Sequence, residues 1–226
     1  MDIANNIERI RQQIDKLIVQ YLRKNSTVQL VAVSKGQSTA QIRAVFAAGQ
    51  RCFGENYLQE ALPKIIELRS LPIEWHFIGK IQRNKTSQIA RYFDWVETID
   101  RWEVAQRLDQ QRPPDLGTLN CCIEVNISGE ISKNGVAVDD VLPLTQRIQS
   151  LKRLQLRGLM VIPRATDNFQ EQLQIYQQVQ KLQHSLQQQG IELDTLSMGM
   201  SNDFAAAIAA GSTSVRIGTA IFGVRL

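Results

Sequence analysis

The sequence has few cysteines and no run of basic residues, and both absences narrow the class of protein. Its 226 residues include 3 cysteines, namely Cys52, Cys121 and Cys122. Their odd number and the absence of a CxxC spacing argue against a disulfide framework and against a zinc site, so we expect reduced thiols buried in a core. The net charge is only +4, and the lysines and arginines are scattered along the chain. This distribution argues against a nucleic-acid partner.

Long uninterrupted apolar runs are also absent. The N-terminal segment MDIANNIERIRQQIDKL mixes apolar with charged residues and lacks the continuous apolar core of a secretion signal. The most apolar stretch, residues 204–226, is interrupted by GSTS and by Arg216, which argues against a membrane span. We therefore expect a soluble, cytoplasmic protein. With 43% apolar residues, the chain is long enough to fold around its own core.

The spacing of the apolar residues predicts alternating helices and strands. From Ile3 to Tyr21 they recur every three or four positions, which is typical of an amphipathic helix. The run VQLVAVS, residues 28–34, is instead apolar and β-branched, as in a parallel strand covered on both faces. Similar runs predict strands over residues 51–55, 74–79, 93–98, 119–126, 154–162, 193–199 and 214–218. Helical patterns follow these strands over residues 39–48, 56–70, 82–91, 101–111, 138–151, 168–189 and 202–210.

Eight such strands favour an α/β fold in which residues 1–226 form a single domain, a closed (β/α)₈ barrel of the TIM type with an extra N-terminal helix. After the eighth strand too few residues remain for a full helix, so we expect the N-terminal helix to cover that gap. The alternative is a doubly wound open sheet. That fold would need a glycine-rich phosphate turn after the first strand, and no GxGxxG motif occurs there. With no free strand edge and no heptad seam, a monomer is expected.

Polar residues at the carboxyl ends of barrel strands are the first candidates for chemistry. Lys35 ends the most apolar strand, where burial would lower the pKa of its ammonium group. A neutral amine is the nucleophile that forms a Schiff base with an aldehyde. The alternative interpretation is a lysine that only marks the exit of the strand into water.

Two turns near the C-terminus predict an anion site. The segment SMGMSNDF places Ser201 before a helix, where backbone amides and a hydroxyl are available. The segment VRIGTAIFG places Gly218 and Thr219 after the last strand, where barrels commonly hold phosphate. Alone, Ser201 could be a helix N-cap and Gly218 a tight turn. Together with Lys35 they indicate a ligand that carries both an aldehyde and a phosphate, and pyridoxal 5'-phosphate fits this description.

Three other polar residues lie on or next to predicted strands. Arg216 shares a face with Gly218, so its guanidinium would meet either a pyridine nitrogen or a structural acid inside the barrel. Asn56 follows the second strand and either contacts the ring of the cofactor or serves as an ordinary loop residue. His76 has no histidine or cysteine at ligand spacing in the sequence, which favours a hydrogen-bonded core histidine over a metal ligand.

Taken together, the motifs resemble the YggS-type pyridoxal phosphate homeostasis family, which includes the PipY, PROSC and PLPBP proteins. The matching segments are VAVSK, FGENYLQE, WHFIGKIQRNK, VNISGEISKNG, LRGLMVIP and SMGMSNDFAAAIAAGSTSVRIGTAIFG. The resemblance implies a barrel similar to the N-terminal domain of alanine racemase, with the cofactor held as a Schiff base on Lys35. It also implies that Ser201, Gly218 and Thr219 form a phosphate cradle. Arg216 would be the partner of the pyridine nitrogen, and Asn56 would make a contact near the ring. Gly36 departs from the family pattern, in which threonine is expected after the lysine.

The resemblance implies a carrier or regulator in intracellular vitamin B6 and amino-acid balance, without clear catalytic turnover and with pyridoxal phosphate-dependent apoenzymes as candidate partners. An arginine keeps its proton, so a pyridine nitrogen opposite Arg216 stays unprotonated and the ring is a poorer electron sink. The enzyme alternative is an amino-acid racemase-like protein. Alanine racemase takes a tyrosine base from a second domain, which we do not expect here. A third hypothesis, a phosphate-binding barrel without a cofactor, leaves Lys35 unexplained.

Overall fold

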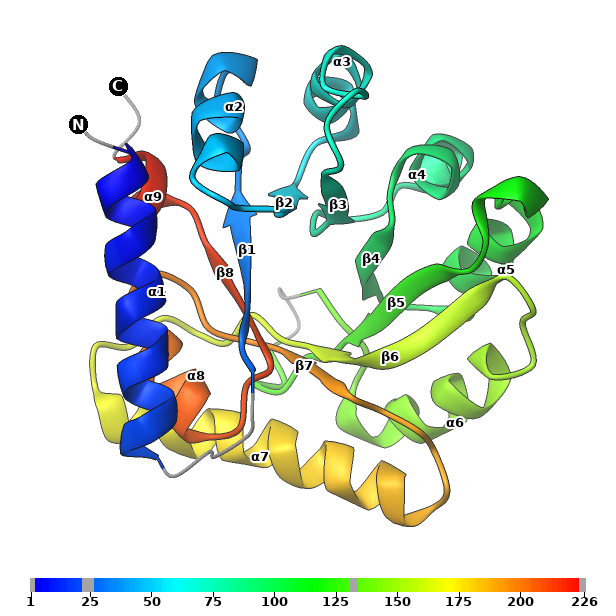
Figure 1. Ribbon diagram of the computed structural model, residues 1–226. Coiled ribbons are helices and arrows are strands. Elements are labelled where there is room, and N and C mark those ends of the chain that lie inside the picture. Colours follow the sequence, from blue (N-terminus) through cyan, green and yellow to red (C-terminus); the bar gives the residue numbers. More distant parts are fainter. Residues whose placement is uncertain (1–2, 22–26, 131–133, 224–226) are drawn as a thin grey trace.

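The computed structural model describes residues 3–21, 27–130 and 134–223; residues 131–133 of the VNISGEISKNG motif lie outside this part. Eight parallel strands close into a barrel in chain order, and the last strand pairs with the first (Figure 1). They are β1 (Gln29–Val33), β2 (Cys52–Glu55), β3 (Glu74–Phe77), β4 (Trp95–Ile99), β5 (Leu119–Glu124), β6 (Leu154–Met160), β7 (Thr195–Ser197) and β8 (Ser214–Ile217). The predicted (β/α)₈ fold class is confirmed, and the alternative of an open sheet is wrong.

Helices follow the strands and cover the outside of the barrel. They are α1 (Ile3–Gln20), α2 (Thr39–Ala47), α3 (Leu58–Glu67), α4 (Thr86–Tyr92), α5 (Trp102–Gln111), α6 (Val138–Ile148), α7 (Phe169–Gln188), α8 (Phe204–Ala209) and α9 (Thr219–Phe222), with 3₁₀ turns η1 (Arg83–Lys85) and η2 (Pro114–Leu116). Local sequence sets several boundaries. Helix α2 begins after Ser38, which forms a reciprocal capping box with Gln41. Strand β7 is shorter than the predicted strand over residues 193–199, and Gly199 follows it with φ of +100°, outside the strand region.

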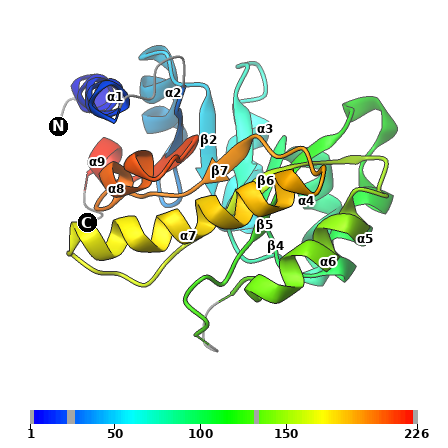
Figure 2. The same cartoon turned by 90° about the horizontal axis from the view of Figure 1, so that it is seen from below.

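The N-terminal helix closes the ring of helices. Helix α9 has only 4 residues, and α1 packs against it, against α8 and against α2 (Figures 1 and 2). The Asn6 amide donates to the carbonyl of Ile221 at 2.9 Å, and the Arg11 guanidinium donates to the carbonyl of Ala48 at 2.8 Å. The prediction that α1 covers the gap after the last strand is therefore confirmed.

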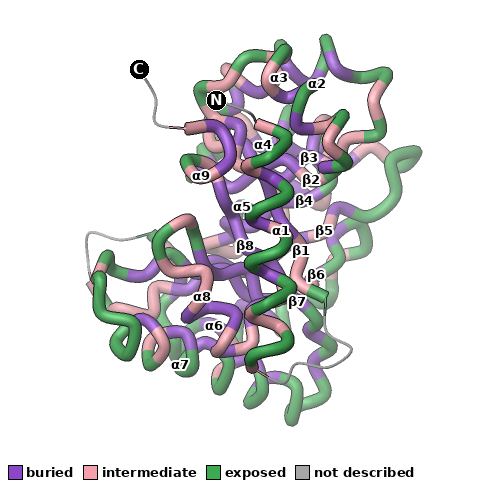
Figure 3. Tube along the Cα trace, turned by 60° about the vertical axis from the view of Figure 1, so that its left-hand side comes forward, coloured by how far each residue is buried: buried purple, intermediate pink, exposed green. Residues whose placement is uncertain are grey.

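Burial is concentrated on the strands and on the inner faces of the helices (Figure 3). Most of the buried apolar residues belong to one large cluster, and Trp95, Cys122 and Met160 form a second, small one. TIM barrels usually fill their interior with layers of branched aliphatic residues. Here the interior also contains buried polar and charged side chains, those of His76, Glu97, Ser197 and Arg216.

The three cysteines do not share one environment. Cys121 and Cys122 are fully buried, as the sequence predicts. Cys52 is only half-buried, and its sulfur lies 3.3 Å from a carboxylate oxygen of Glu74. The expectation of three core thiols is therefore wrong for Cys52, because the pairing of β2 with β3 sets it opposite an acidic residue.

Membrane insertion through a helix finds no support in the structure. Within the described ranges, none of the helices combines the length and the apolar character that crossing a bilayer requires.

Candidate functional site

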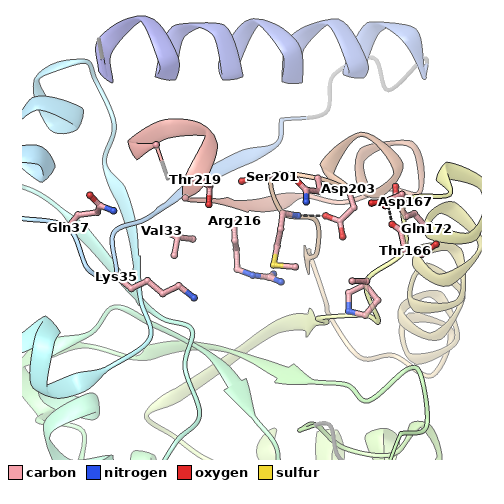
Figure 4. A pocket seen from close by; sticks show the side chains of 16 residues that line it. Val33, Lys35, Gln37, Thr166, Asp167, Gln172, Ser201, Asp203, Arg216 and Thr219 are labelled. Atoms are coloured by element: carbon pink, nitrogen blue, oxygen red, sulfur yellow. Dashed lines mark hydrogen bonds between the residues drawn. The ribbon is translucent and has the colours of Figure 1, made fainter. Parts of the chain in front are cut away.

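A cavity of about 410 Å³ lies beyond the carboxyl ends of β1 and β8, next to the turn that precedes α8. Five of the six predicted site residues line it: Lys35, Ser201, Arg216, Gly218 and Thr219. Lys35 and Arg216 extend into the cavity from β1 and β8, and Ser201 and Thr219 lie along one wall (Figure 4). Its volume is in the range that holds a small organic ligand.

A buried ion cluster anchors the end of β1 next to Lys35. The Lys64 ammonium on α3 donates to the carbonyl of Ser34 at 2.9 Å and to the carboxylate of Glu55 at 2.9 Å. The Ser34 hydroxyl donates to the same carboxylate at 2.6 Å. Although these partners favour the ionised form, burial raises the pKa of Glu55. Lys64 lies inside an otherwise ordinary amphipathic helix, and no local sequence signal marks it as part of the site. The cluster holds the backbone from which half-buried Lys35 projects.

The residue after Lys35 has a backbone conformation that favours glycine. Gly36 has φ of +72°, and its N–H donates to the carboxylate of Glu60. A β-branched threonine would be strained at this φ. The departure from the family pattern at Gly36 therefore matches the conformation of this turn.

The predicted phosphate-binding residues Ser201, Gly218 and Thr219, here called the phosphate wall, lie on two turns. Thr219 begins α9, with Gly218 as its N-cap residue, and Ser201 lies in the turn before α8. The N-cap of α8 is Asp203, so the alternative interpretation of Ser201 as an N-cap is wrong. A Cβ at Gly218 would lie 3.2 Å from the carbonyl oxygen of Val33, so a side chain would crowd the backbone there. Backbone amides and hydroxyls exposed in such turns are suited to an oxyanion.

Arg216 has an acidic partner and also faces the cavity. Its Nη1 donates to Ser197 Oγ at 2.5 Å, and its Nη2 donates to the carbonyl of Val161 at 2.9 Å. Ser197 in turn donates to Glu97 Oε2 at 2.5 Å, and Glu97 Oε2 lies 4.0 Å from Arg216 Nη1. Glu97 is thus the structural acid that the sequence analysis named as one of two alternative partners of Arg216. The guanidinium of Arg216 also lines the cavity.

Glu97 connects Arg216 to His76. Glu97 Oε1 lies 2.6 Å from His76 Nδ1, and His76 Nε2 lies 2.9 Å from Glu74 Oε1. Burial opposes ionisation of Glu97, but the hydrogen bond and charge of His76, together with Arg216, hold the pKa of Glu97 below its usual value. His76 is a hydrogen-bonded core histidine, as the sequence favours, yet Cys52 lies beside it across the β2–β3 pair. No cysteine lies near His76 in the sequence, but the fold brings Cys52 next to it.

Asn56 is not among the cavity-lining residues. Its side-chain oxygen is buried and has no hydrogen-bond partner among the described residues. Its backbone is pressed against Gly79, where a Cβ would lie only 1.9 Å from the carbonyl oxygen of Asn56. The amide oxygen of Asn56 lies just after the end of β2. The predicted contact between Asn56 and the cofactor ring therefore remains a hypothesis.

Glu124 is an ionisable group at the end of β5 that the sequence analysis did not consider. It alternates with Cys122, which points into the barrel, so the two share a face. Burial, reinforced by the negative charge of Asp100, raises the pKa of Glu124 to about 7. A carboxyl with this pKa changes its charge near neutral pH.

Replacing Glu124 by glutamine in cofactor-free protein is expected to raise the free energy of unfolding at pH 8 relative to wild type, and to change it much less at pH 4.5. Because the folded-state pKa of about 7 exceeds the ordinary glutamate value of 4.5, the folded protein binds more protons between these values. Wild-type stability therefore falls as the pH rises through this window, by about 3 kcal/mol in total. Urea denaturation at both pH values measures the difference. The exposed Glu103 on α5 gives a matched Glu→Gln control, and a benefit of Glu124→Gln that does not change with pH would contradict the prediction.

The sequence comparisons agree with this geometry. Residues 2–226 match the family model described as alanine racemase, N-terminal domain. The pyridoxal phosphate homeostasis protein of Pseudomonas aeruginosa is 49% identical over 223 residues, which cover 99% of this chain and 96% of that protein. The protein with the same name from Escherichia coli K12 is 44% identical over 227 residues, covering 99% of this chain and 97% of that protein.

Solved structures extend the comparison to the fold. The structure of PipY from Synechococcus elongatus with pyridoxal phosphate (PLP) bound matches with a TM-score of 0.86 and 37% identity, over 98% of this chain and 100% of that chain. Alanine racemase from Clostridium difficile shares the fold, with a TM-score of 0.74 and 12% identity over 99% of this chain and 57% of that chain. The chain therefore belongs to the alanine racemase N-terminal domain family and, within it, to the pyridoxal phosphate homeostasis proteins.

Proposed function

We propose that this protein binds PLP in the cavity beyond β1 and β8 and acts in vitamin B6 and amino-acid homeostasis. The observation that carries the proposal is the convergence of an amine, a guanidinium and two hydroxyls on one cavity, contributed by Lys35, Arg216, Ser201 and Thr219. Relatives of 44% and 49% identity are named pyridoxal phosphate homeostasis proteins, and the PipY structure contains PLP. In this proposal residues 1–226 act as a single cofactor-binding domain.

Each functional group of PLP has a chemically matched partner in the cavity. The Lys35 amine would hold the aldehyde as a Schiff base, with a C=N bond formed and water released. Arg216 would supply the partner of the pyridine nitrogen, and Ser197 and Glu97 hold its guanidinium in place at the cavity. Ser201, Thr219 and the backbone at Gly218 would hold the phosphate, and Asn56, which lies outside the cavity lining, would contact the ring only from beyond it.

The residues present favour a carrier over an enzyme. When bound, PLP supplies an aldehyde and an electron-withdrawing ring, and an arginine opposite the pyridine nitrogen does not protonate it. We therefore propose a cytoplasmic, monomeric carrier that delivers PLP to apoenzymes. The racemase alternative predicts PLP-dependent exchange of the amino-acid α-proton in deuterium oxide. Rapid exchange by the wild-type protein would replace the carrier proposal with that alternative.

Pyridoxal without its phosphate is expected to bind far more weakly than PLP. Hydrogen bonds to a charged group contribute roughly 1.5 to 3 kcal/mol each, which corresponds to about 10- to 150-fold in affinity for every bond lost. Absorption titrations with the two compounds measure the ratio. The double variant Ser201→Ala/Thr219→Val should reduce the ratio of PLP affinity to pyridoxal affinity. Ser70→Ala, at an exposed serine after α3, should leave this ratio unchanged. Equal affinity of wild type for the two compounds would overturn the proposed phosphate wall.

A further inference from the structure

The opposite end of the barrel carries a second cluster of polar side chains. Cys52 and Glu74 are the first residues of β2 and β3, so they lie at the amino ends of the strands, while Lys35 lies beyond the carboxyl end of β1. Cys52, Glu74 and His76 bring a sulfur, a carboxylate oxygen and a ring nitrogen within 4.8 Å of one another. The proposed cofactor site uses none of these three groups.

Two distances within this cluster are close to the ligand–ligand distances of a tetrahedral zinc site. Cys52 Sγ lies 3.3 Å from Glu74 Oε1, and His76 Nε2 lies 2.9 Å from the same oxygen. Zinc bonds of about 2.0 Å to nitrogen and oxygen and about 2.3 Å to sulfur give tetrahedral ligand–ligand distances of about 3.3 to 3.5 Å. The two distances to Glu74 Oε1 are therefore within a few tenths of an ångström of these values, and the sulfur and the ring nitrogen lie within 4.8 Å of each other.

Gln29 lies at a fourth corner of the cluster. Its side-chain nitrogen is 3.0 Å from Cys52 Sγ and 3.0 Å from Glu74 Oε1. Because the two ends of a glutamine amide have the same shape, a half-turn of the amide places its oxygen at this position instead. Either this oxygen or a water molecule can complete a tetrahedral set with three protein ligands.

The second ring nitrogen of His76 has a carboxylate partner, as is usual for metal-binding histidines. His76 Nδ1 faces Glu97 Oε1 at 2.6 Å, and Glu97 is itself held by Ser197. A ligating histidine usually donates its second ring N–H to a carboxylate, which fixes the ring and leaves the other nitrogen for the metal. Here that other nitrogen, Nε2, is the one that faces Glu74.

Solvent reaches the cluster from the amino end of the barrel. The Glu74 side chain is 39% exposed, and Glu74 and Gln29 both line a cavity of about 730 Å³. Trp95 Nε1 and Ser214 Oγ also belong to residues that line this cavity, and both atoms are buried without a hydrogen-bond partner among the described residues. Unpaired buried polar atoms of this kind point to bound water or another polar occupant.

We propose that Cys52, Glu74 and His76 form a Zn²⁺ site at the amino end of the barrel, with Gln29 or a water as the fourth ligand. Thiolate and imidazole ligands select zinc over magnesium and calcium, which prefer oxygen. One thiolate and one carboxylate balance the charge of the ion. This site lies at the end of the barrel opposite the proposed PLP cavity, and its test with Co²⁺ is made without PLP.

Cobalt(II) is the probe for this site, because it occupies zinc sites and absorbs visible light. Protein freed of metal with a chelator and kept reduced is titrated with Co²⁺ alone. We expect one ion per chain, the intense visible bands of a tetrahedral complex, and a near-ultraviolet thiolate-to-cobalt band. Addition of Zn²⁺ should abolish all of these bands. Weak octahedral bands without a thiolate band would overturn the proposal, since they indicate binding to surface oxygens only.

Two substitutions assign the ligands. Cys52→Ser should abolish the thiolate-to-cobalt band, and Glu74→Gln, which keeps the thiol, should weaken Co²⁺ binding while PLP binding is retained. Cys122→Ala is the matched control, because Cys122 is a buried thiol outside the cluster, and it should keep the full spectrum. Retention of the thiolate band in Cys52→Ser, or its loss in Cys122→Ala, would overturn the assignment.

Discussion

Borohydride reduction of the PLP-loaded protein is expected to attach the cofactor irreversibly to the peptide that contains Lys35. Reduction converts the C=N bond of a Schiff base into a stable amine, so peptide mapping reports which lysine formed it. In Lys35→Ala the visible absorption of the lysine-bound cofactor should disappear, and reduction should label no peptide. PLP should still bind to this variant, more weakly, through the Arg216 and Thr219 side of the cavity.

Lys80 and Lys85 provide matched controls for this experiment. Both follow β3 at the same carboxyl end of the barrel, and neither lines the cavity. Lys80→Ala and Lys85→Ala should keep the absorption and the label on Lys35. A label on either of these residues in the wild-type protein, or retained lysine-bound absorption in Lys35→Ala, would overturn the assignment of the Schiff base.

The barrel could be predicted because its strands and helices each carry their own periodicity. A β-branched apolar run such as residues 28–34 needs no distant partner to be identified as a strand covered on both faces. The number of such runs then restricts the architecture, and the short segment after β8 explains why α1 completes the ring. Local pattern is sufficient at this level.

The cavity-lining residues could be predicted where they lie on or shortly after the carboxyl end of a strand. Lys35, Gly218 and Thr219 were found in this way, because the carboxyl ends of all strands of a barrel meet on one face. Glu97 and Ser197 were missed because they are 100 residues apart and meet only inside the barrel. Alternation along β4 marks Trp95 and Glu97 as sharing a face, but only the strand register shows what an inward acid contacts. The proximity of Cys52 to His76 depends on register in the same way.

Replacing Arg216 by leucine is expected to lower the free energy of unfolding by about 1.5 to 3 kcal/mol, because it removes one of the two positively charged neighbours of the buried Glu97 carboxylate and leaves only His76 beside it. Urea denaturation of cofactor-free protein in the presence of a chelator measures the loss. Arg43→Leu is the matched control. Its partner Glu67 is 3.8 Å away, and the two side chains are 47% and 54% exposed, so this substitution should cost less than about 1 kcal/mol.

The double variant Arg216→Leu/Glu97→Gln tests whether the loss comes from the attraction between Arg216 and Glu97. If it does, removing the carboxylate should return part of the lost stability, so the double variant should be more stable than the sum of the two single losses predicts. The Ser197 hydroxyl, which bridges Arg216 and Glu97, can still donate to the side-chain amide oxygen introduced by the Glu97→Gln change. Losses that simply add would show that Arg216 and Glu97 are not coupled, and the held position of the guanidinium at the cavity would then need another cause.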